Sequence, residues 1–344
     1  VIHSGFRIVI SPRTEDNLQG LDYIMIVPSL DLLRAAADLV HDVILPTPQI
    51  RWPLLCERAG ADVWVKHENH TPIGAFKVRG GIVYMDELKR RCTDVMGVIA
   101  ATRGNHGQSV AFAAARAGLQ SVLVVPHGNS REKNAAMRAL GAELVEHGGD
   151  FQEAYEHALR LAETKHLHMV PSFDEALVRG VASYALELFC AVADLDAVYV
   201  PIGLGSGICG TIAARDALAL RTEVIGVVAA HAAAYGMSYE AGRPITSAVT
   251  PTIADGMAVR VPDAAALEII LKGATRIVTV DENEIEAAMR YLFSDTHNAA
   301  EGSGAAPLAA LLQERERMRG RRVALVLSGG NIDRETFARI LAEK

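Results

Sequence analysis

Residues 71–81 read TPIGAFKVRGG, and this stretch sets what the chain can be. Lys77 directly follows an aromatic residue, Phe76, and glycines stand at positions 74, 80 and 81. Because glycine has no side chain, backbone and neighbouring groups can pack closely around the lysine. A lysine in such a desolvated place has a lowered pKa and can act as a nucleophile and proton carrier. The simpler alternative is a solvated lysine on a helix face.

Three more glycine-rich stretches each follow a predicted strand and precede a predicted helix. They are residues 102–107 (TRGNHG), 203–210 (GLGSGICG) and 328–331 (SGGN). Glycines at such a junction let backbone N–H groups approach a phosphate or a carboxylate. A tight turn with no ligand is the simpler alternative for each stretch. The combination of these stretches with Lys77 favours a binding site.

The stretch 203–210 also spells the GxGxxG pattern of dinucleotide-binding proteins through Gly205, Gly207 and Gly210. That pattern requires an acidic residue at the end of the next strand, where it binds a ribose hydroxyl. Here the next strand ends in residues 227–230 (VVAA), and Glu223 lies at its start. The loop is therefore better suited to a single phosphate, and an NAD-dependent oxidoreductase is the less favoured class.

The composition narrows the possible classes of function. The chain has 344 residues, which suits two domains, and 50% of them are hydrophobic while 22% are charged. The formal net charge of −7 comes without a run of like charges, so nucleic-acid binding is not expected. Charged residues interrupt every apolar stretch before the roughly 18 residues that a membrane span needs.

The cysteines are few and scattered, with no CxxC spacing. They are Cys56, Cys92, Cys190 and Cys209. This pattern indicates free thiols in a reducing compartment and neither disulfides nor a zinc site. We therefore expect a cytoplasmic protein.

Strand and helix patterns alternate along most of the chain. Ser29 is expected to cap a helix that ends near residue 41, and a second helix is expected to follow the lysine stretch and run to about residue 91. Strands are expected at residues 62–68, 97–101, 121–125, 143–146, 167–170, 197–201, 223–228, 276–280 and 322–327. Apolar strands separated by helices predict an α/β fold whose parallel sheets are covered on both faces.

The number of strands exceeds what one compact sheet holds comfortably, so we predict two α/β domains. A small domain would cover residues 98–178. A large domain would combine residues 25–97 with 179–344. Residues 1–24 lack periodicity and a secretion-type apolar segment, and they are interpreted as a poorly specified N-terminal extension.

These motifs together resemble the fold-type II pyridoxal-phosphate enzymes, specifically the threonine/serine dehydratase group. The family's S-F-K-x-R-G motif matches residues 75–80, with alanine in place of serine, and its S-x-G-N-H loop matches residues 102–106, with threonine in place of serine. Its phosphate loop matches residues 203–207 and its S-G-G-N matches residues 328–331. The resemblance extends to residues 252–256 (TIADG) and 301–305 (EGSGA), and so covers the chain from about residue 45.

The resemblance implies a tryptophan synthase β-like arrangement with pyridoxal 5′-phosphate in the cleft between the two domains. Lys77 would form the Schiff base, Phe76 would lie against the pyridine ring, and Ser328 would meet the ring nitrogen. Asn105 would bond the 3′ oxygen, and Glu301 would sit near the ring without an assigned role. Backbone N–H groups would hold the phosphate at Gly203, Gly205, Ser206 and Gly207. The substrate carboxylate would be held by Thr102, Gly104, Asn105 and His106.

Two departures from the family pattern narrow the expected activity. Serine racemases of this family have a second serine where this chain has Arg103, so racemisation is not expected. Arg103 either binds a second carboxylate of the substrate or is a surface arginine. Metal-dependent relatives carry acidic ligands after the strand that follows the phosphate loop, where this chain reads VAAHAAA at residues 228–234. Hard cations need oxygen ligands, so no metal site is expected, and His231 is interpreted as structural.

The resemblance implies a dehydratase, or ammonia-lyase, that converts a β-hydroxy amino acid such as threonine or serine to a 2-oxo acid and ammonia. Dehydration of 3-hydroxyaspartate or phenylserine, and β-replacement chemistry, remain alternatives. The expected partners are a small amino-acid substrate and a second copy of the chain in a homodimer.

Overall fold

The computed structural model describes residues 28–250 and 252–343, so the predicted extension at 1–24 lies outside the described residues. One sheet has six strands in the order β1-β2-β10-β7-β8-β9. Its strands are β1 (Gln49–Arg51), β2 (Asp62–His67), β7 (Ala197–Pro201), β8 (Glu223–Ala229), β9 (Arg276–Val280) and β10 (Arg322–Leu327). Neighbouring strands run parallel except β1, which pairs antiparallel with β2.

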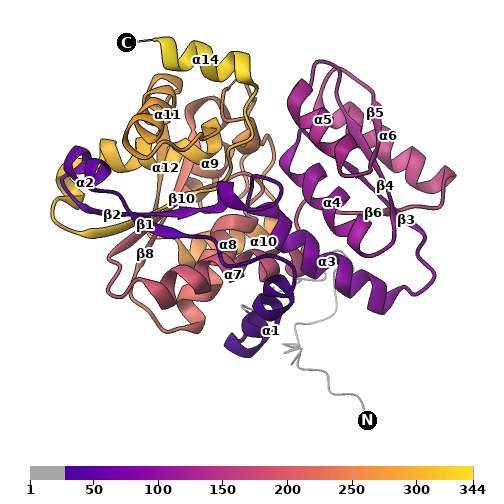
Figure 1. Cartoon of the computed structure of the whole chain (residues 1–344), viewed down its shortest axis with the longest axis horizontal. Coiled ribbons are helices and arrows are strands. Elements are labelled where there is room, and N and C mark those ends of the chain that lie inside the picture. The colour runs from indigo at the N-terminus through magenta and orange to yellow at the C-terminus, as the bar shows by residue number, and fades with distance from the viewer. Residues whose placement is uncertain (1–27, 251, 344) are drawn as a thin grey trace, which may run out of the picture.

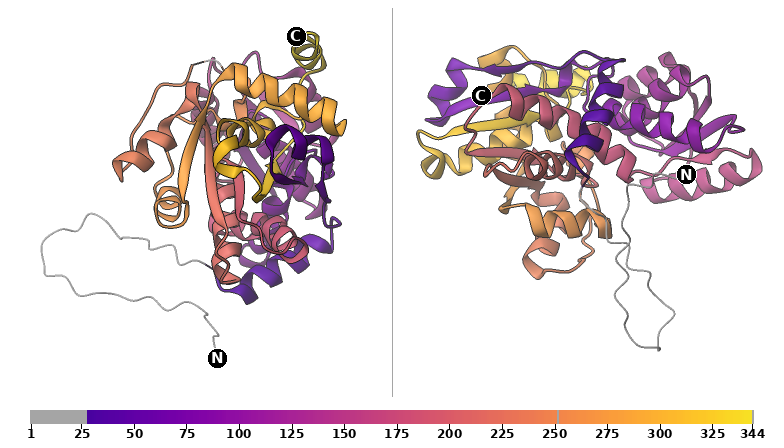
Figure 2. Two further views of the ribbon diagram at one scale, coloured as in Figure 1. Left: turned by 90° about the vertical axis from the view of Figure 1, so that its left-hand side faces the viewer. Right: turned by 90° about the horizontal axis from the view of Figure 1, so that it is seen from below.

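The second sheet has four parallel strands in the order β5-β4-β3-β6. Its strands are β3 (Gly97–Ala101), β4 (Gln120–Val125), β5 (Glu143–Glu146) and β6 (His168–Met169). Every strand expected from the sequence is present, with ends that agree or differ by one residue. The two sheets lie side by side, each with helices around it (Figures 1 and 2).

Helices cover both sheets. The α-helices are α1 (Leu30–His41), α2 (Pro53–Ala59), α3 (Lys77–Arg91), α4 (Asn105–Arg116), α5 (Arg131–Ala139), α6 (Phe151–Thr164), α7 (Glu175–Ala191), α8 (Ser206–Ala217), α9 (Ala234–Ala241), α10 (Ala264–Gly273), α11 (Glu282–Thr296), α12 (Gly302–Gln313), α13 (Arg315–Met318) and α14 (Arg334–Ala342). Three short 3-10 helices are η1 (Glu68–His70), η2 (Ala230–Ala232) and η3 (Asp255–Met257). None of the described helices is long and apolar enough to cross a membrane.

Local sequence signals explain where several helices begin. Ser29 accepts a hydrogen bond from the N–H of Leu32, as expected for the cap of α1. Asp281 and Glu284 form a reciprocal capping box at the start of α11. These caps satisfy backbone donors that have no partner inside the helix. They fix the helix starts independently of tertiary contacts.

The sequence did not predict α2 or β1. The strand β1 has only three residues, too few for an alternating pattern to show. The helix α2 begins at Pro53, which is favourable in the first turn, but its seven residues give little periodicity. The antiparallel β1 places Gln49 opposite Lys66 at the edge of an otherwise parallel sheet.

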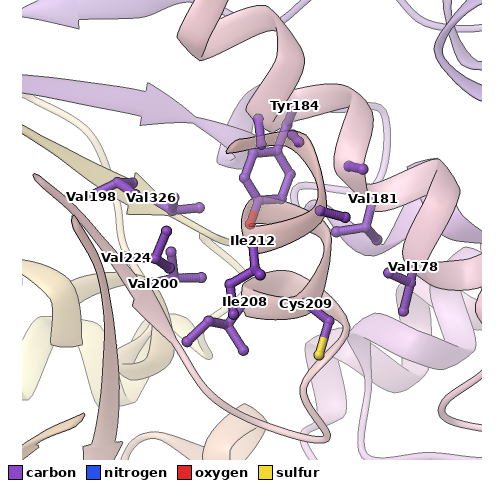
Figure 3. Close-up of a cluster of buried hydrophobic side chains, with 14 of the residues drawn as sticks. Val178, Val181, Tyr184, Val198, Val200, Ile208, Cys209, Ile212, Val224 and Val326 are labelled. Atoms are coloured by element: carbon purple, nitrogen blue, oxygen red, sulfur yellow. The ribbon is translucent and has the colours of Figure 1, made fainter. Parts of the chain in front are cut away.

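One of the large core clusters joins the six-stranded sheet to α7 and α8. Figure 3 shows valines of β7, β8 and β10 on one side of this cluster and side chains of α7 and α8 on the other. Tyr184 of α7 is fully buried there, and its hydroxyl donates to the Gly207 carbonyl at 2.8 Å. Burial of this apolar surface is the main force that fixes α8 against the sheet. The start of α8, which carries the phosphate-loop motif, is thereby held in place.

Candidate active site

The lysine segment is fastened to the 328–331 stretch by backbone hydrogen bonds. The N–H of Phe76 donates to the Ser328 carbonyl at 3.0 Å, and the N–H of Gly330 donates to the Gly74 carbonyl at 3.0 Å. The Thr71 hydroxyl donates to the Ala75 carbonyl, so the turn before the lysine is closed on itself. The stretches at 71–81 and 328–331, more than 250 positions apart in sequence, are therefore joined by backbone hydrogen bonds, and Lys77 follows directly after this joined segment.

Lys77 is the first residue of α3 and lines a small cavity. The cavity is lined by Lys77, Gly80, His106, Ser172, Leu177, Val181 and Ser206. The Lys77 ammonium lies 4.9 Å from the centre of the Phe76 ring, and no hydrogen bond or ion pair joins it to any described residue. Burial lowers the pKa of Lys77 to about 8. The site therefore holds an amine that is partly neutral near physiological pH, as Schiff-base chemistry requires.

The first turns of three long helices meet at this cavity. Lys77 begins α3, Asn105 and His106 begin α4, and Ser206 begins α8. The first N–H groups of a helix have no partner within it and carry partial positive charge. Such a convergence attracts anionic groups and disfavours an ammonium on Lys77.

In the glycine turn before α8, positions 203 and 205 have no room for a side chain. A Cβ at position 203 would lie 2.3 Å from the Gly256 carbonyl oxygen, and Gly205 has a φ of +104°. Gly207 packs against Phe76, since a Cβ there would lie 3.6 Å from Phe76 Cζ. The turn therefore lies beside the lysine segment. The strand β8 ends without an acidic residue, which argues against a dinucleotide.

The loop at residues 102–107 is organised around a buried hydroxyl. Thr102 Oγ1 accepts hydrogen bonds from the N–H groups of Gly104 at 3.0 Å and Gly107 at 2.9 Å. Burial, together with the nearby Lys77, lowers the pKa of His106 to about 3, so its ring is neutral at pH 7. The buried His106 Nε2 has no partner among the described residues. Arg103 is exposed to solvent beside this loop.

Asn105 is held from two sides. Its side-chain nitrogen donates to Glu301 Oε1 at 2.6 Å, and its side-chain oxygen accepts from Asn331 at 2.8 Å. Glu301 is buried, and its second oxygen lies 3.3 Å from the Lys133 ammonium, which also donates to Asp255 at 2.7 Å. The sequence predicted positions 105 and 301 but gave no signal for Lys133, because nothing in its local pattern distinguishes it from other helix lysines.

A parallel α/β architecture with a buried lysine between a glycine turn, here residues 203–207, and a loop at the start of a helix, here residues 102–107, is typical of the fold-type II class of pyridoxal-phosphate enzymes. The model of the family "Pyridoxal-phosphate dependent enzyme" matches residues 40–329. The chain belongs to this family, and its two-sheet fold is of the tryptophan synthase β-like type.

Named relatives lie close in sequence and in structure. The chain is 34% identical over 317 residues to an L-threonine ammonia-lyase of Thermotoga maritima, with 91% of this chain and 78% of the relative covered. It is 36% identical over 308 residues to an L-threonine ammonia-lyase of Geobacter sulfurreducens, covering 89% of this chain and 76% of the relative. The processed form of threonine deaminase isoform 2 of Solanum lycopersicum superimposes with a TM-score of 0.84 at 29% identity, covering 92% of this chain and 95% of that one.

The residues present fit pyridoxal 5′-phosphate, which is the cofactor of this family. An amine of lowered pKa suits its aldehyde, and the glycine-rich turn at the start of α8 suits its phosphate. The buried His106 Nε2 has no partner among the described residues, and His106 lines the same cavity as Lys77, which indicates that a polar ligand completes the site.

Metal-dependent relatives carry acidic ligands in the region of residues 228–234, and in this chain His231 of that region lies near Glu282. Glu282 accepts hydrogen bonds from the Thr252 hydroxyl and the Ile253 N–H, and His231 Nδ1 lies 3.8 Å from the same carboxylate. Among residues 28–250 and 252–343 no group of three or more His, Cys, Asp or Glu side chains is arranged to hold a metal ion.

Proposed function

We propose that the chain is an ammonia-lyase that converts a β-hydroxy amino acid, such as L-threonine or L-serine, to a 2-oxo acid and ammonia. The observation that carries the proposal is the unpaired Lys77 amine in one cavity with the first turns of α4 and α8. The two bacterial relatives named as threonine ammonia-lyases support the choice of substrate class.

In this proposal the cofactor, when bound, withdraws electrons from the substrate Cα. Lys77 removes the Cα proton, and its lowered pKa makes the neutral amine available for this step. The Cβ–O bond breaks and the hydroxyl leaves as water after gaining a proton. The released enamine takes up water and yields the 2-oxo acid and ammonia.

The remaining predicted residues would bind and orient the cofactor and the substrate. Backbone N–H groups of Gly203, Gly205, Ser206 and Gly207 would hold the phosphate. Thr102, Gly104, Asn105 and His106 would hold the substrate carboxylate, with Thr102 contributing chiefly by closing the turn. Phe76 would pack on the ring, and Ser328, which is buried at the end of β10, would meet the ring nitrogen. A neutral serine hydroxyl does not enforce a positively charged ring, which suits elimination.

Dehydration of 3-hydroxyaspartate is the second candidate, because Arg103 is exposed beside the carboxylate loop and could pair with a second carboxylate. Phenylserine dehydration and β-replacement have no such observation in their favour. Racemisation is not proposed, since an arginine replaces the serine expected for the second base.

A substrate panel tests the proposed function. Purified enzyme is incubated with L-threonine, L-serine, 3-hydroxyaspartate and phenylserine, and both ammonia and 2-oxo acid are measured. We expect equal amounts of the two products from at least one of them, and no product from the Lys77→Ala variant. Ammonia release without 2-oxo acid, or full activity of Lys77→Ala, would contradict the proposal.

We further propose a cytoplasmic homodimer. The resemblance to the dehydratase group supports the dimer, and the absence of any disulfide among the four cysteines, all within the described residues, supports a reducing compartment. Light scattering coupled to size exclusion would give twice the chain mass of 36.8 kDa for a dimer.

A further inference from the structure

A buried ionic cluster connects the four-stranded sheet to the candidate site. Lys133 lies on α5, which joins β4 to β5, and its side chain is 7% exposed. Its ammonium donates to Asp255 Oδ2 at 2.7 Å and lies 3.3 Å from Glu301 Oε2. Asp255 and Glu301 both belong to the part of the chain that carries the six-stranded sheet.

The aliphatic stem of Lys133 packs directly against Gly104 in the loop at residues 102–107. A Cβ at Gly104 would lie 2.4 Å from Lys133 Cδ and 3.2 Å from its Cγ. Any side chain at position 104 would therefore displace the lysine. The loop sequence makes room for Lys133 to reach Glu301.

Helix α5 is anchored so that Lys133 cannot easily withdraw. Ser130, the N-cap of α5, donates to Asp333 Oδ1 at 2.6 Å, and Asp333 also accepts from the Glu132 N–H. In return, Glu132 Oε1 accepts from the N–H of Arg334, the first residue of α14, at 2.9 Å. The two helices thus cap one another.

Charge balance in the cluster depends on Lys133. Burial raises the pKa of Glu301, and the Lys133 ammonium opposes that rise. Burial alone would lower the pKa of Lys133, but Glu301 and Asp255 raise it overall, so the ammonium keeps its charge. With Lys133 in place Glu301 can stay an acceptor for Asn105, whose other side accepts from Asn331.

We propose that Lys133 is a positioning residue that acts through Glu301 to fix the Asn105 amide, so that one of its two N–H donors is held by Glu301 and the other faces the cofactor's 3′ oxygen. This proposal rests on the cofactor placement given above and not on the identity of the substrate. Lys133 touches neither cofactor nor substrate in it. Without the ammonium, Glu301 would take up a proton, and the amide would exchange a charged acceptor for a weaker neutral one that can also turn its O–H toward it.

A double-mutant cycle on cofactor binding tests the proposal. The cofactor is removed chemically, and pyridoxal 5′-phosphate is titrated back while its absorbance band and Kd are recorded. Lys133→Met, which keeps the length of the stem, and Glu301→Gln should each shift the band and raise Kd by about tenfold or more, as expected when one partner of a buried ion pair is removed. The double variant should behave like either single variant, because both changes act along one route.

The controls separate positioning from general stability. Lys133→Arg should restore Kd to within about threefold of the parent, since it retains the charge. Lys165→Met removes an exposed pair with Glu143 near the same sheet and should leave both band and Kd unchanged. Should Lys133→Met not fold, as judged by thermal unfolding of the apoprotein, the cycle is repeated with Lys133→Gln.

Two results would overturn the proposal. One is an unaltered band and Kd in folded Lys133→Met or, where that variant does not fold, in Lys133→Gln. The other is an effect of the double variant equal to the product of the single effects. The placement of the cofactor has its own test, because loss of the band in Lys77→Ala depends on neither Lys133 nor Glu301.

Discussion

Arg79 and Lys77 lie two residues apart on α3, yet their surroundings are opposite. Arg79 is fully buried and bonds Glu68 at 2.7 Å and Glu187 at 2.5 Å, while Lys66 bonds Glu187 at 2.5 Å. Two cations thus balance two carboxylates. The Lys77 ammonium has no hydrogen-bonded or ion-paired partner among the described residues, and its pKa is lowered by burial.

The difference shows how one helix turn serves two purposes. A balanced buried network holds the helix rigidly, because breaking any pair would leave an uncompensated charge. The unbalanced lysine is destabilising in the free protein and becomes useful when a ligand reacts with it. Stability comes from Arg79, and reactivity comes from Lys77.

Removing the reactive amine should have the largest effect on function. Lys77→Ala should lose the yellow absorbance band of the bound cofactor and lower kcat by about 10⁴-fold, near the upper range for loss of a proton-transfer group. Absorbance spectra and 2-oxo acid assays measure both effects. Retention of the band would show that a different amine holds the cofactor.

Removing the balanced arginine should instead damage the fold. Arg79→Met should lower the free energy of unfolding by about 3–5 kcal/mol, because Glu68 and Glu187 would lose their buried partner. Urea denaturation of the apoprotein measures this. The matched control Arg339→Met breaks exposed pairs with Glu286 and Glu343 and should change the free energy of unfolding by less than about 1 kcal/mol. A similar small loss in both variants would remove the contrast between the two residues.

Burial of the Lys77 ammonium should lower the free energy of unfolding of the apoprotein by an amount that depends on pH. The folded-state pKa of about 8 lies below the usual value near 10.4, so between these values the unfolded state binds more protons. Below pH 8 the cost of burying the ammonium is complete, and it disappears as the pH rises through that window. Apoprotein with Lys77→Met should therefore melt about 2 °C higher than the parent at pH 7.

Melting curves recorded at several pH values would reveal this cost. The difference in Tm between Lys77→Met and the parent should shrink toward zero by about pH 10.5. A difference that is constant across this range would show that packing of the methionine, and not the charge of the lysine, is responsible.

The smallest expected effect concerns Arg103. Arg103→Ala should lower kcat/KM for 3-hydroxyaspartate by about tenfold relative to threonine if the arginine pairs with a second carboxylate. Steady-state kinetics on both substrates measure the ratio. An equal change on both would assign Arg103 to the surface and leave threonine or serine as the better candidate.

The sequence predicted much of this site because of parallel topology. The stretches at 203–210 and 328–331 follow β7 and β10, which are parallel neighbours in the six-stranded sheet and end at a common edge, and the stretch at 102–107 follows β3 of the other parallel sheet in the same way. Lys133 and Asp255 could not be found in this way. They lie 122 positions apart and meet only through packing of the two sheet units, which no local pattern records. The edge strand β1 was missed because three residues carry no period.

The mutual capping of α5 and α14 has a consequence for motion. Any swing of the four-stranded sheet away from the six-stranded sheet must separate Ser130 from Asp333 and Glu132 from Arg334. Each separation exposes a helix start whose backbone donors then need water. If ligands enter and leave between the two sheets, their rates of entry and release should therefore depend on how often the first turn of α14 opens. These contacts at the start of α14 would then limit the motion from outside the reacting site.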